Sequence, residues 1–97
     1  MKLKVTRKTG SNGTTTLKLE GEFTIYTARK LRNLLMKELD TAGRLELDLA
    51  GVSRFDSAGY QLLVHAGEEA GKRGGTLAVS GKSDEVTTLL ALYGAGK

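Results

Sequence analysis

Apolar and polar residues alternate along four short stretches of the chain, at the two-residue period of half-buried β-strands. These stretches are residues 2–6, 14–20, 44–49 and 76–80. In the first, Leu3 and Val5 alternate with lysine and threonine. Residues 9–13 then combine glycine, serine and asparagine, which favour turns and separate the first two stretches. The chain is therefore expected to open with a β-hairpin.

Three other stretches carry apolar residues at spacings of three and four, the period of an amphipathic helix. They run from Thr24 to about Asp40, from about Ser57 to Lys72, and onward from Ser83. Thr24 and Ser83 are suitable N-caps, while residues 21–24 are expected to break the second strand. The resulting element order is β-β-α-β-α-β-α. This order predicts an α/β fold with a mixed four-stranded sheet and helices packed on it, formed by residues 1–97 as one domain.

The composition removes several classes of chemistry. The 97 residues include no cysteine, so disulfides, thiolate metal sites and cysteine nucleophiles are excluded. The one histidine, His65, would lie about 12 Å along a helix from Ser57, too far to act as its base. Gly81-Lys82-Ser83 resembles the end of a phosphate-binding loop, but Thr76 occupies the position that needs glycine. We expect no enzymatic activity, cofactor or metal.

The net charge of +4 is unevenly distributed. Residues 1–43 carry nine Lys/Arg against four Asp/Glu, and residues 44–97 carry six against seven. The basic residues of the first half are spread over strands and a helix, which favours a solvated face over a nucleic-acid site. No apolar run approaches the roughly 20 residues that cross a bilayer, and the first residues lack a signal-peptide core. We expect a cytoplasmic protein without direct nucleic-acid binding or membrane insertion.

Ser57 stands where the second helix is expected to begin, after Asp56 and two residues before Gly59. The first N–H groups of a helix lack intrahelical acceptors and carry partial positive charge. Two interpretations follow. Ser57 is either a plain N-cap, or a residue that can be phosphorylated and whose phosphate those N–H groups would stabilise.

Three motifs in this order resemble the STAS domain, the family typified by bacterial anti-sigma factor antagonists. They are Gly21-Glu22-Phe23 before a capped helix, Leu45-Glu46-Leu47-Asp48-Leu49, and Phe55-Asp56-Ser57-Ala58-Gly59. The last contains an Asp-Ser/Thr-x-Gly signature. The resemblance implies that Ser57 is phosphorylated by a partner that is both serine kinase and anti-sigma factor, and that the unphosphorylated domain binds this partner.

The partner-binding residues that the resemblance implies lie near the expected starts of the first and second helices. They are Thr24, Tyr26, Arg54, Asp56, Ser57, Gly59 and Tyr60. The chain departs from the family pattern at Thr24, where an aspartate is usual, and at Tyr60, where an aliphatic residue is common. Its short C-terminal part also resembles the small STAS subunit of bacterial lipid-transport ABC complexes. The alternative is therefore a constitutive adaptor that binds a related ATPase.

Overall fold

The computed structural model describes residues 3–10, 12–41 and 43–93, which contain four strands and three helices. The strands are β1 (Leu3–Thr9), β2 (Thr14–Phe23), β3 (Arg44–Phe55) and β4 (Thr76–Lys82). The helices are α1 (Ile25–Leu39), α2 (Ser57–Lys72) and α3 (Asp84–Tyr93). The predicted element order is confirmed, and so are the predicted bounds of α2.

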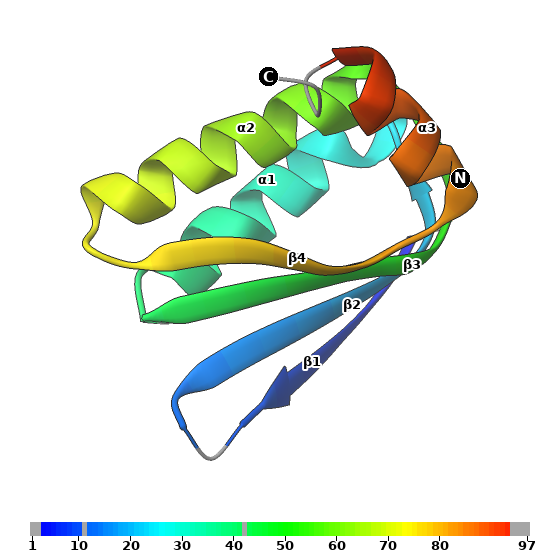
Figure 1. Ribbon diagram of the computed structural model, residues 1–97. Helices are drawn as coiled ribbons and strands as arrows, with labels where there is room; N and C mark the ends of the chain where they lie inside the picture. The colour runs from blue at the N-terminus through cyan, green and yellow to red at the C-terminus, as the bar shows by residue number, and fades with distance from the viewer. Residues whose placement is uncertain (1–2, 11, 42, 94–97) are drawn as a thin grey trace.

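The strands form one mixed sheet in the order β1-β2-β3-β4. β1 is antiparallel to β2, whereas β2, β3 and β4 are parallel to one another. Figure 1 shows α1 and α2 side by side over the same face of the sheet, with α3 near the carboxyl ends of the parallel strands. The three parallel strands therefore direct the starts of all three helices toward one end of the molecule.

The core fills the space between the sheet and the two long helices. Alternate leucines of β2 and β3 point toward the helices, and leucines at helical spacing on α1 face them. The fully buried large side chains are Phe23, Leu17, Leu19, Leu31, Leu35, Leu45, Leu47, Leu49, Val52 and Val86. On α2, Ala66 and Ala70 are buried beside Leu62 and Leu63. These alanines are small, which lets α2 lie close to its neighbours.

All four strands extend beyond their predicted ends. β1 continues through Thr9, β2 through Phe23, β3 through Phe55 and β4 through Lys82. The expectation that residues 21–24 break the second strand is wrong, because β2 passes this point with a register shift against β3. Gly21 has φ 113° there, a left-handed conformation that glycine adopts without strain. Hydrogen bonding between neighbouring strands thus extends the sheet where the sequence no longer alternates.

Candidate functional site

The strands β2 and β3 end side by side. Phe23 is opposite Phe55 in the parallel pairing, and the two ring centroids are 5.3 Å apart at an interplanar angle of 56°. The helices α1 and α2 begin immediately after these residues. In open parallel sheets, binding sites form at this carboxyl edge of the strands, where the loops and helix starts converge.

Asp56 joins the starts of both helices. Its Oδ1 accepts a hydrogen bond from the Gly59 N–H at 3.0 Å, and its Oδ2 accepts one from the Ile25 N–H, also at 3.0 Å. One carboxylate thus satisfies an unpaired donor on each helix and places negative charge beside two positive helix ends. The N-cap of α2 is therefore Asp56, and the interpretation of Ser57 as a plain N-cap is wrong.

Ser57 is the first residue of α2, and its side chain is exposed. Because Asp56 supplies the cap, the fold does not depend on the Ser57 hydroxyl for this bond. The hydroxyl group is thus located at a helix start, next to a carboxylate, where a second protein can reach it.

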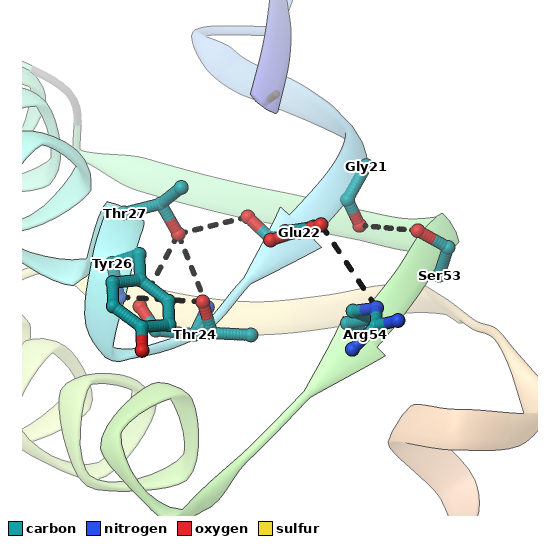
Figure 2. A network of polar contacts seen from close by, with 7 residues as sticks. All are labelled: Gly21, Glu22, Thr24, Tyr26, Thr27, Ser53 and Arg54. Atoms are coloured by element: carbon teal, nitrogen blue, oxygen red, sulfur yellow. Dashed lines mark hydrogen bonds and ion pairs between the residues drawn. The ribbon is translucent and has the colours of Figure 1, made fainter. Parts of the chain in front are cut away.

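Thr24 is the N-cap of α1, as predicted. Its Oγ1 accepts from the Tyr26 N–H at 3.3 Å, while its own N–H donates to Thr27 Oγ1 at 3.1 Å. The Thr27 hydroxyl in turn donates to the Glu22 carbonyl at 2.8 Å, and Figure 2 shows these groups converging at the end of β2. Thr24 and Thr27 are both buried. Thr24 therefore acts by holding the helix start in place and presents little surface to a partner.

Gly59 is also buried, in the first turn of α2. A Cβ atom at this position would lie 2.6 Å from the Phe23 carbonyl oxygen and 2.8 Å from a ring carbon of Phe55. Both distances are shorter than real contacts of a Cβ atom. Only glycine lets α2 approach the strand ends this closely, so Gly59 positions the helix and offers a partner no side chain.

Large apolar and aromatic side chains lie in the first turns of α1 and α2. Tyr26 is 78% exposed and Ile25 is 66% exposed, both in the first turn of α1. On α2, the Tyr60 ring packs at a tilt against Tyr93 of α3, with ring centroids 5.3 Å apart and an interplanar angle of 43°. The sequence analysis identified Tyr26 and Tyr60 but not Ile25 or Tyr93. The available signal for Ile25 was a large apolar residue in the first turn of a helix whose start is polar.

A depression of about 580 Å³ lies beside Asp56 at this end of the sheet. Its lining residues are Glu22, Thr24, Tyr26, Ser53, Arg54, Phe55, Asp56 and Glu85. It carries three carboxylates against one guanidinium group, so its character is acidic. Arg54 Nε lies 3.9 Å from Glu22 Oε2, and Ser53 Oγ donates to the Gly21 carbonyl at 3.2 Å (Figure 2). The structure thus brings together four of the predicted partner-binding residues, Thr24, Tyr26, Arg54 and Asp56.

Glu22, Ser53 and Glu85 also line this depression and were not among the residues predicted from the sequence. Glu22 is part of the Gly21-Glu22-Phe23 motif at the end of β2, and Ser53 lies two residues before the Phe55-Asp56-Ser57-Ala58-Gly59 motif, near the end of β3. Glu85 belongs to the first turn of α3 and reaches the site only through the packing of that helix. No local sequence signal relates it to Asp56.

The residues that the structure describes contain neither a metal-binding cluster nor a membrane-spanning helix. Within residues 3–10, 12–41 and 43–93, no three His, Cys, Asp or Glu side chains gather to hold a metal ion. Over the same residues, each helix is too short or too polar to span a bilayer.

Comparison with known proteins agrees with this architecture. The family model described as "Mlab, STAS domain" matches residues 6–97. No curated protein sequence matches the chain.

Solved structures with the same fold include an anti-sigma factor antagonist from Mycobacterium paratuberculosis. It has a TM-score of 0.84 and 22% identity, over 96% of this chain and 79% of that one. The phosphorylated form of the Bacillus cell fate determinant SpoIIAA has a TM-score of 0.73 and 16% identity, over 96% and 86% of the two chains. A sulfate transporter family protein from Wolinella succinogenes has a TM-score of 0.74 and 28% identity, over 90% and 71%. On the strength of the family match and the shared architecture, the chain belongs to the STAS domain family.

Proposed function

We propose that this STAS domain is an anti-sigma factor antagonist, which docks on a serine kinase that is also an anti-sigma factor and dissociates when Ser57 is phosphorylated. The observation that carries the proposal is the exposed hydroxyl of Ser57 at the first position of α2. The likeness to anti-sigma factor antagonists, and to SpoIIAA in its phosphorylated form, supports the same conclusion.

The docking surface combines two kinds of contact. Ile25 and Tyr26 offer exposed apolar area, which is typical of the buried centre of protein interfaces. The acidic depression beside Asp56 suits lysine or arginine side chains on the partner, since opposite potentials steer association and fix orientation. Ser57 directly follows Asp56, which lines the depression and accepts the Ile25 N–H, so docking on both areas would bring the partner close to Ser57.

Phosphorylation opposes docking by charge and by volume. For transfer to occur, the γ-phosphate of the partner's nucleotide must lie in line with the Ser57 hydroxyl. The product phosphoserine, with a charge of about −1.5 to −2, would then face the remaining nucleotide phosphates. It would also lie next to the Asp56 carboxylate, which already occupies the Gly59 N–H. The phosphate would therefore weaken the complex without removing the bonds that hold the two helix starts.

Mapping of the phosphate tests the proposal directly. The chain is incubated with ATP and the kinase that co-purifies with it, digested with trypsin and analysed by mass spectrometry. Cleavage after Arg54 and Lys72 gives a peptide of residues 55–72, in which Ser57 is the one serine and no threonine is present. We expect the phosphate on this peptide, at Ser57. Phosphate on Tyr60, on another peptide or on none would contradict the proposal.

Two substitutions of Ser57 separate the effect of a negative charge on binding from the effect of losing the hydroxyl group. Ser57→Ala is expected to retain binding to the co-purifying partner and lose phosphorylation, whereas Ser57→Asp is expected to weaken binding at least tenfold. Thr88→Asp is a matched control, because Thr88 is an exposed hydroxyl residue on α3. It should bind like the wild-type chain. Equal binding by Ser57→Asp and Thr88→Asp would refute the switch.

The second candidate is the constitutive adaptor subunit of a lipid-transport ABC complex. The description of the family model and the likeness to a sulfate transporter family protein favour it. An adaptor would use the same exposed surface to hold an ATPase, but without phosphate transfer. It predicts co-purification with an ABC ATPase, no phosphate on residues 55–72 after incubation with ATP, and near-normal transport by a strain carrying Ser57→Ala.

A further inference from the structure

The strand β1 lies at one edge of the sheet, opposite the edge formed by β4 (Figure 1). It pairs with β2 on one side, and no strand among the described residues pairs with it on the other. A free edge presents backbone N–H and C=O groups that can accept another strand. Its seven residues, Leu3–Thr9, would match an extended segment of about the same length.

The hairpin geometry shows which groups of β1 point outward. Gly10 N–H donates to the Thr14 carbonyl at 2.7 Å, so these two residues form a hydrogen-bonded pair. In an antiparallel ladder such pairs alternate with non-bonded ones. Counting back along the register, Lys4, Thr6 and Lys8 exchange bonds with β2. The N–H and C=O groups of Val5 and Arg7 therefore face the free edge.

An apolar groove runs beside this edge, between β1 and α1. Its volume is about 280 Å³, and its apolar lining comes from Leu3 and Val5 on β1 and from Leu31 and Leu34 on α1. Leu3, Val5 and Leu34 are half-buried. Every second side chain of a strand added to β1 would point toward α1 and could enter this groove.

The charges around the groove are positive. Lys30 and Lys37 line it from α1, and among the described residues no carboxylate lies within 4.0 Å of either ammonium group. β1 contains Lys4, Arg7 and Lys8 and no acidic residue. Arg7 is already neutralised by Glu38 at 2.8 Å, which leaves the four lysines unpaired within the described part of the chain.

A second copy of the chain is a poor occupant of this edge. Antiparallel pairing of two β1 strands would bring lysines of both copies onto the same face. Like charges opposite one another destabilise such a pair, and lysine on an edge strand is a common protection against self-association. The same lysines favour a partner strand that carries carboxylates.

We propose that the β1 edge and the adjoining groove bind an extended acidic segment of another protein, in which apolar and acidic residues alternate. The segment adds a fifth strand to the sheet through the outward groups of Val5 and Arg7. Its apolar side chains fill the groove, while its carboxylates point to the opposite face of the sheet and pair there with Lys4 and Lys8. Lys30 and Lys37 add positive potential at the rim of the groove. This surface is separate from Ser57 and does not depend on the switch.

The test uses two capped seven-residue peptides as probes, one alternating glutamate with valine and one alternating lysine with valine. Each is titrated into the ¹⁵N-labelled full chain and followed by NMR. We expect the acidic peptide to shift the amide signals of Val5, Arg7 and Leu34 and to bind at least tenfold more tightly than the basic peptide. Upon binding, the Val5 and Arg7 N–H groups should also become protected from hydrogen exchange.

Variants separate strand addition from simple charge attraction. Lys4→Glu combined with Lys8→Glu should weaken binding of the acidic peptide at least tenfold, whereas Lys82→Glu, on the opposite edge strand, should change the affinity less than twofold. Val5→Pro should abolish the protection of the Arg7 N–H, because proline removes the Val5 donor through which the segment pairs. The fold should remain, since proline is tolerated at an edge position whose N–H faces solvent.

Several results would overturn the proposal. The first is equal affinity for the acidic and the basic peptide. The second is a set of amide shifts confined to the surface around Ser57. The third is a loss of affinity in the Lys82→Glu variant as large as in the double lysine variant. Concentration-dependent dimerisation through β1 would assign the edge to a second copy instead. Selective binding to phosphatidylglycerol vesicles, without any response to the acidic peptide, would assign it to a lipid surface.

Discussion

Replacing Gly59 with alanine tests whether close packing of α2 against the strand ends positions the site. The new Cβ would lie 2.6 Å from the Phe23 carbonyl oxygen and 2.8 and 2.9 Å from two ring carbons of Phe55. The oxygen belongs to a buried strand end, and the ring packs at a tilt against Phe23, so neither can move freely. Overpacking of this kind costs about 1–3 kcal/mol.

Helix propensity acts in the opposite direction, because alanine is favoured over glycine inside a helix by up to about 1 kcal/mol. We therefore expect Gly59→Ala to lower the free energy of unfolding by about 1–2 kcal/mol. For a domain of this size each kcal/mol corresponds to about 4–8 °C in Tm. The loss should be evident in both thermal and urea denaturation.

The same helix offers a matched control. A Cβ at Gly67 would meet no atom within 4 Å, so Gly67→Ala gains propensity without a clash. We expect this variant to be more stable than the wild-type chain by about 0.5–1 kcal/mol. Urea denaturation should give opposite shifts of the midpoint for the two variants at an unchanged m-value. Equal shifts, or a Gly59→Ala variant as stable as Gly67→Ala, would refute the packing argument.

The remaining predictions concern the contacts that surround the site and join the helices. Asp56→Ala removes the acceptor shared by both helix starts and should cost about 2 kcal/mol of unfolding free energy in urea denaturation; a loss below about 0.5 kcal/mol would contradict the double cap. Arg73→Ala breaks a 3.1 Å hydrogen bond to the Met36 carbonyl of α1 and should lower the free energy of unfolding in urea by about 1 kcal/mol. Lys72→Ala loses only an exposed ion pair and should lower it by less than about 0.5 kcal/mol, and equal losses would contradict this ranking. A double-mutant cycle of Tyr60→Ala and Tyr93→Ala should give a coupling energy of about 0.5–1 kcal/mol by thermal denaturation, and additive losses would show that the rings do not interact.

Local patterns predicted the elements that depend on local physics. The bounds of α2 and the caps Thr24 and Ser83 follow from helical periodicity and from hydroxyl groups that can accept a backbone N–H, and Ser83 accepts the Val86 N–H at 3.3 Å. The ends of β2 and β3 did not follow, because residues near Phe23 and Phe55 are held by pairing with each other across the sheet. Such pairing carries no signal in either stretch alone.

The site, like the fold, was predictable from the sequence where it depends on local residues. The motif around Ser57 located the helix start, but the capping role belongs to Asp56, which also binds the Ile25 N–H from 31 residues away. Glu85 joins the depression only because α3 folds back toward the strand ends. Sequence reasoning therefore identified the local centre of the site and missed the contributions that depend on tertiary packing.

The most direct measurement is the affinity of the co-purifying kinase for two forms of the intact chain, one unmodified and one carrying stoichiometric phosphate on Ser57. Isothermal titration calorimetry in the presence of ADP would compare them under identical conditions. We expect the phosphate to weaken binding at least tenfold, or about 1.4 kcal/mol, while the circular dichroism spectrum of the free domain stays the same. Equal affinities for the two forms would contradict the account, since the exposed hydroxyl would then have no influence on the docked partner.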